Sequence, residues 1–81
     1  MSIVKGSIVR ATAGRDKDNF FVVLETDEKF AIIADGKRRK IEHPKRKKLI
    51  HLASTKTVIE GSFETNPQIK RILNQFIKNG G

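Results

Sequence analysis

The chain has 81 residues, no cysteine and a formal net charge of +8 at pH 7. This length suits one domain with a small core, and the lack of cysteine excludes disulfides and thiolate–metal sites. The longest apolar runs have five residues, whereas a membrane-spanning helix needs roughly 20. Residues 1–10 also lack the apolar core of a signal peptide. We therefore expect a soluble, cytoplasmic, monomeric protein with no membrane partner.

Three segments in the first half of the chain have the composition of β-strands. Residues 6–12, 20–26 and 29–35 are rich in Val, Ile and Phe, and Gly, Asp and Asn bound them. Residues 26–29 are expected to form a tight turn between the second and third segments.

The next part of the chain predicts two further short strands. Asp35-Gly36 is a strong signal for a two-residue hairpin turn, because such turns need positive φ angles. Residues 37–42 would then pair back onto the preceding strand, until Pro44 interrupts pairing. Residues 48–53 would form the fifth strand. Five short strands indicate a mainly β protein with a small, half-open, SH3-like barrel.

This barrel is expected to span residues 1–54, and its strands have more apolar residues than one interior needs. Phe20, Val22 and Leu24 point to one face of the second strand, while Phe21 and Val23 point to the other. The second apolar face therefore requires a cover.

The C-terminal part of the chain supplies a candidate cover. Residues 66–79 are expected to form an amphipathic helix, preceded by a linker over residues 55–65. Its apolar stripe consists of Ile69, Ile72, Leu73, Phe76 and Ile77. Asn66 can cap the helix, Pro67 suits its first position, and Gly80 suits its end. The preferred interpretation is that this helix docks on the barrel. The alternatives are that it binds a partner, forms a dimer or lies on a membrane surface.

Positive charge is concentrated in one short segment. Residues 37–48 contain eight of the 17 lysines and arginines, with Glu42 as the only acid. Core-forming residues also lie in or next to this segment, namely Ile41, Leu49, Ile50 and Leu52. A disordered tail would not need them, so we expect a folded surface that binds a polyanion. A solvated face without a partner and a targeting signal remain alternatives.

Catalytic and cofactor-binding motifs are missing from the sequence. It has no HExxH, CxxC or GxxxxGK[ST] motif and no nucleophile beside a base. We expect no enzyme activity, cofactor, metal site or small-molecule substrate. His51 lies in an apolar run and is expected to pack in the core, whereas Asp16 and Asp18 are expected to balance loop charge.

The loop between the first two strands has a family resemblance. The stretch GSIVRATAGRDKDNFFVV resembles the KOW motif, in which a strand, a glycine-containing loop and a second strand form part of an SH3-like barrel. Gly14 occupies the characteristic glycine position and Lys17 matches a frequent loop lysine. Asp18 stands where a glycine is usual, and Phe21 where a small residue is usual.

The resemblance extends over about residues 4–53, and the C-terminal helix also fits it. The order of segments is similar to that of short bacterial KOW-domain RNA-binding proteins, which resemble a large-subunit ribosomal protein of archaea and eukaryotes. It implies RNA binding connected with the ribosome or translation, with ribosomal RNA and ribosomal proteins as partners. The expected RNA-binding residues are Arg15, Lys17, Lys37, Arg38, Arg39, Lys40, Lys45, Arg46, Lys47 and Lys48. Gly14, Asp35 and Gly36 are expected to shape their loops.

The aromatic residues of the sequence indicate how RNA would be recognised. The chain has no Trp or Tyr, and its five Phe residues lie in apolar contexts. Reading single-stranded RNA usually requires exposed aromatic side chains, so we expect recognition of structured RNA by shape and charge. Two alternatives remain: a KOW-type protein-interaction or transcription-elongation module, and a protein that binds duplex DNA.

Overall fold

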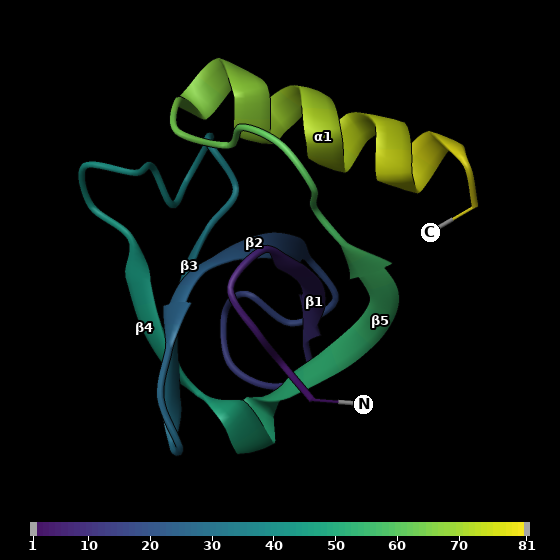
Figure 1. Ribbon diagram of the computed structural model, residues 1–81. Helices are drawn as coiled ribbons and strands as arrows, with labels where there is room; N and C mark the ends of the chain where they lie inside the picture. The colour runs from purple at the N-terminus through teal and green to yellow at the C-terminus, as the bar shows by residue number, and fades with distance from the viewer. Residues whose placement is uncertain (1, 81) are drawn as a thin grey trace.

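The computed structural model describes residues 2–80 and contains one antiparallel sheet of five strands in the order β4-β3-β2-β1-β5. The elements are β1 (Ser7–Ala11), β2 (Phe20–Thr26), β3 (Phe30–Ala34), β4 (Lys45–Lys48), the 3₁₀ helix η1 (Leu49–His51), β5 (Leu52–Val58) and α1 (Asn66–Lys78). The sheet curls around its inner face, and α1 lies across the outside (Figure 1). Strands β4 and β5 form its two edges, so the barrel is not closed. The expected mainly β fold with a C-terminal helix is confirmed.

The first core fills the inside of the curled sheet. Val9 pairs with Phe21 between β1 and β2, and Val23 pairs with Ile33 between β2 and β3. These four side chains are almost completely buried together, and Leu52 from β5 joins them. Because successive side chains of a strand point to opposite faces, the same strands also present a second apolar face.

The second core lies between the outside of the sheet and α1. Ile8 and Val22 are buried against Ile69 and Leu73 of the helix. Phe20 and Phe76 meet edge to face with their ring centroids 5.2 Å apart, a favourable aromatic geometry. The prediction that α1 covers the second face of the sheet is therefore confirmed.

The start of α1 is capped by a different residue from the one expected. Thr65 is the N-cap and accepts a hydrogen bond from the Gln68 N–H, while the Gln68 side chain accepts from the Thr65 N–H. This reciprocal pair is a capping box. Asn66 instead accepts from the Ile41 N–H at 2.8 Å and donates to Glu42 at 2.7 Å. The helix start is thereby joined to the segment that follows β3.

The prediction of a two-residue hairpin after β3 was wrong. Residues 35–44 form a longer loop, and pairing with β3 resumes only at Lys45, directly after Pro44. The physical reason is the Asp35 carboxylate, which accepts hydrogen bonds from the N–H groups of Lys37 and Arg39 at 2.8 and 2.9 Å. These bonds satisfy backbone groups that a strand over 37–42 would have paired.

The expected fifth strand was also misplaced. Residues 49–51 form η1, and β5 then continues to Val58, so residues 55–58 of the expected linker belong to the sheet. Ile50 is 81% exposed rather than part of the core. His51 is half-buried at the end of η1. Within residues 2–80, no helix is both long and apolar enough to cross a membrane.

Candidate nucleic-acid interface

The loop between β1 and β2 is held in shape mainly by its own backbone. The N–H of Asp18 donates to Ala11 at 2.8 Å, and that of Asn19 donates to Asp16 at 3.0 Å. Gly14 has a φ of +79°, in the left-handed region that glycine adopts readily. Asp18 also has a positive φ, +71°, and Asp is among the few other residues that tolerate it. Two positions of this loop, Gly14 and Asp18, thus have the left-handed backbone conformation.

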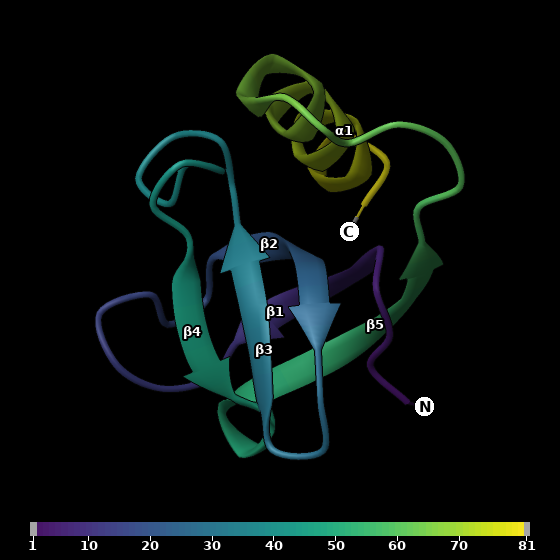
Figure 2. The same cartoon turned by 60° about the vertical axis from the view of Figure 1, so that its left-hand side comes forward.

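The segment between β3 and β4 forms a backbone turn that leaves most of its basic side chains exposed. Besides the two bonds accepted by the Asp35 carboxylate, the Asp35 N–H donates to the Arg39 carbonyl at 2.9 Å. The turn closes on itself, and Lys37, Arg38 and Lys40 remain exposed. Figure 2 shows this segment and the loop after β1 projecting on the same side of the molecule, next to β4.

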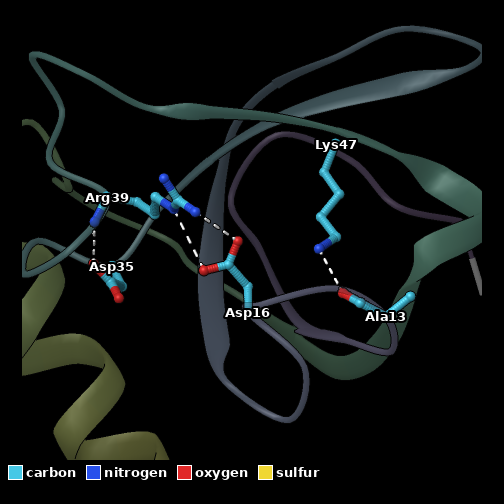
Figure 3. A network of polar contacts seen from close by, with 5 residues as sticks. All are labelled: Ala13, Asp16, Asp35, Arg39 and Lys47. Carbon is cyan, nitrogen blue, oxygen red and sulfur yellow. Dashed lines mark hydrogen bonds and ion pairs between the residues drawn. The ribbon is translucent and has the colours of Figure 1, made fainter.

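An ion pair joins these two loops. Asp16 is only 3% exposed, and its carboxylate accepts from Arg39 Nη2 at 3.0 Å and from Arg39 Nε at 3.4 Å (Figure 3). Two parallel bonds from one guanidinium fix orientation as well as distance. The Arg39 side chain is 30% exposed. Because its guanidinium is bonded to Asp16 within the protein, Arg39 positions the two loops and is not a free cation for a ligand.

A lysine from β4 makes a second connection to the loop after β1. Lys47 Nζ donates to the Ala13 carbonyl at 2.7 Å, and the residue is only 8% exposed (Figure 3). Lys47 pairs with Ala31, which belongs to the inner core, so it lies on the inward face of β4. The buried position of Lys47 argues against the expectation that it contacts RNA directly.

The outward side chains of β4 remain available. Arg46 and Lys48 are exposed, as strand alternation requires when Lys47 points inward. The Arg46 guanidinium carbon lies 3.7 Å from the centre of the Phe30 ring, within cation–π distance. The ring supports the guanidinium over the outer face of the sheet. Lys45, at the start of the strand, is half-buried.

The ten expected RNA-binding residues thus fall into different structural groups. Seven are exposed: Arg15, Lys17, Lys37, Arg38, Lys40, Arg46 and Lys48. We call these seven the basic surface. Lys45 and Arg39 are half-buried and Lys47 is buried, and Arg39 and Lys47 connect the loops. Asp16, which makes the central ion pair, was missed as a site residue because a single aspartate among loop charges carries no signal of burial.

The fold and the site together define a small antiparallel β module that presents cations from two connected loops and an edge strand. Among residues 2–80, no group of three His, Cys, Asp or Glu side chains could hold a metal ion. The chain matches no model of a known protein family, and no curated protein gives a significant match.

Proposed function

We propose that this chain is a non-catalytic RNA-binding protein associated with the ribosome or translation, which binds structured RNA through the basic surface. The observation that carries the proposal is the connection of two basic segments, distant in sequence, through Asp16 and Arg39. Lys and Arg side chains contact phosphates and thereby position a protein on a nucleic acid. A net charge of +8 also favours encounter with a polyanion.

The distribution of aromatic side chains supports recognition by shape and charge. Phe21 is buried, and the other four phenylalanines are half-buried in packing contacts. Extended single strands are usually bound by rows of exposed aromatic rings. A cationic surface without such a row suits the phosphates of a folded RNA. The connection to the ribosome rests on the KOW resemblance alone.

Sedimentation of the tagged protein through a sucrose gradient of cell lysate tests this function. We expect the protein to migrate with ribosomal particles and to release ribosomal RNA when the bound nucleic acid is extracted. Co-migration with genomic DNA after RNase treatment would instead favour a duplex-DNA-binding protein. A light fraction containing another protein and no nucleic acid would favour a protein-interaction module.

A further inference from the structure

A hollow of about 270 Å³ lies beside the basic surface, between α1 and the turn that follows β3. Gly36 makes this closeness possible: a Cβ atom there would lie 2.5 Å from the Asn66 carbonyl oxygen and 2.9 Å from Lys70 Cγ. The Asp35 carboxylate then holds the turn through the Lys37 and Arg39 N–H groups. The wall formed by this turn is therefore fixed against the first turns of the helix.

The lining of the hollow combines apolar surface with positive charge. Phe20, Leu73 and Ile77 form an apolar wall, and Phe20 is held in place by its edge-to-face contact with Phe76. Lys37 and Arg38 reach the hollow from the turn, and Lys70 reaches it from α1. A purely electrostatic phosphate site would not need the apolar wall, and a core cavity would not hold three cations.

Two amide side chains and Asp35, whose carboxylate accepts from the Lys37 and Arg39 N–H groups, complete the lining. Asn19 and Asn74 border the hollow from opposite elements, the end of the loop before β2 and the helix. An amide offers both donors and acceptors, as the edge of a nucleobase does. Ligand sites for drug-sized molecules have volumes of roughly 300–1,000 Å³, so a hollow of about 270 Å³ suits a group smaller than a typical drug molecule.

We infer that this hollow takes one unpaired nucleotide of the bound RNA, with its base against the apolar wall and its phosphate near Lys37, Arg38 and Lys70. The inference rests on the proposed function and makes it more specific. The basic surface holds the phosphates of the structured RNA, and the hollow selects RNAs in which a bulge or loop offers an unstacked base. Such bases are the usual targets of sequence-specific RNA recognition.

The test uses three versions of one RNA hairpin and the full-length protein. One has a perfect stem, the second has a single bulged adenosine, and the third has an abasic bulge that preserves the bend of the backbone. We expect the bulged adenosine to bind about tenfold more tightly than either of the others. Equal binding of all three RNAs would overturn the inference and leave the proposed function intact, whereas failure of all three to bind would reject the proposed function itself.

A matched pair of variants tests the location of the nucleotide. Asn74→Glu places a negative charge in the hollow, and Gln75→Glu makes the same charge change at the next residue, which is exposed and does not line it. The tenfold preference should disappear in Asn74→Glu and persist in Gln75→Glu. Loss of the preference in both variants, or in neither, would overturn the assignment. Tight binding of adenosine monophosphate without any preference for the bulged RNA would assign the hollow to a free nucleotide and contradict the inference.

Discussion

Asp16 and Arg39 are 23 residues apart in the chain, yet the carboxylate of one accepts two hydrogen bonds from the guanidinium of the other. Asp16 is buried, and Arg39 belongs to the segment with most of the positive charge. The Asp16 carboxylate thus has a structural role: its ion pair with Arg39 joins the two loops. The other cations of these loops, Arg15, Lys17, Lys37, Arg38 and Lys40, are exposed.

Removing the charge of Asp16 should destabilise the fold. Breaking a buried ion pair leaves an uncompensated charge and can cost 3–5 kcal/mol. Because Arg39 is 30% exposed, we expect Asp16→Asn to lower the free energy of unfolding by about 2 kcal/mol. Asp18→Asn is the matched control, since the Arg10–Asp18 pair is exposed and should contribute less than about 0.5 kcal/mol. Urea unfolding measures both, and equal losses would contradict a special role for Asp16.

Two adjacent lysines should respond differently to the same substitution. Lys48 is exposed, whereas the Lys47 ammonium is covered and donates to Ala13. If Lys48 contacts a phosphate of a structured RNA, Lys48→Met should make the slope of log affinity against log salt about 0.9 less negative. Lys47→Met should leave that slope unchanged. RNA titrations at several salt concentrations, on variants that melt cooperatively, measure the slopes; a larger change for Lys47→Met would place its ammonium at the RNA.

A side chain at Gly36 should separate the basic turn from the helix. Gly36 has a φ of +78°, and an added Cβ would lie 2.5 Å from a backbone oxygen of α1. Backbone strain and this overlap together should cost about 2–3 kcal/mol in Gly36→Ala. Gly61→Ala is the control, because a Cβ at Gly61 meets no atom within 4 Å. Thermal melts that show the same loss for both variants would mean that the contact with the helix is unimportant.

The turn between β2 and β3 predicts part of the acid sensitivity. Hydrogen bonds from the Lys29 and Phe30 N–H groups lower the pKa of Asp27 below its ordinary value of 3.8, and the Arg46 charge adds to this effect. Since the folded-state pKa is depressed, the stabilisation is fully present well above pH 3.8 and is lost as pH falls through the folded-state pKa. Asp27→Asn should therefore melt at a lower temperature than the parent at pH 7, and the difference should shrink below pH 3.8. A pH-independent difference would contradict this linkage.

The sequence predicted those parts of the fold that alternation and turn residues encode. The apolar residues on both faces of segment 20–24 led to two cores and to a helical cover, and the structure contains both. Gly14 was expected to shape the loop after β1, and it has a φ of +79° there. In these cases one local signal determined the outcome.

The errors lie where a side chain makes a long-range or unusual contact. Asp35-Gly36 carries a hairpin signal, but the Asp35 carboxylate binds two backbone N–H groups and opens a longer loop. Strand β4 consists only of Lys and Arg, so alternation of hydrophobicity could not reveal that Lys47 points inward. The role of Asn66 likewise depends on Ile41, 25 residues away. Such contacts exist only once the fold has formed.

The central claim is that the loop after β1 and the segment after β3 form one RNA surface. The most direct test is the salt dependence of RNA affinity for Arg15→Ala/Lys17→Ala, because both side chains are exposed. Lys5→Ala/Lys56→Ala is the charge-matched control, since Lys5 precedes β1 and Lys56 lies on β5, the sheet edge opposite β4. If the parent neutralises about four phosphates of a structured RNA, log affinity should fall against log salt with a slope of about −3.6. We predict a slope of about −1.8 for the loop variant and an unchanged slope for the control; identical slopes for the parent and the loop variant would contradict the claim.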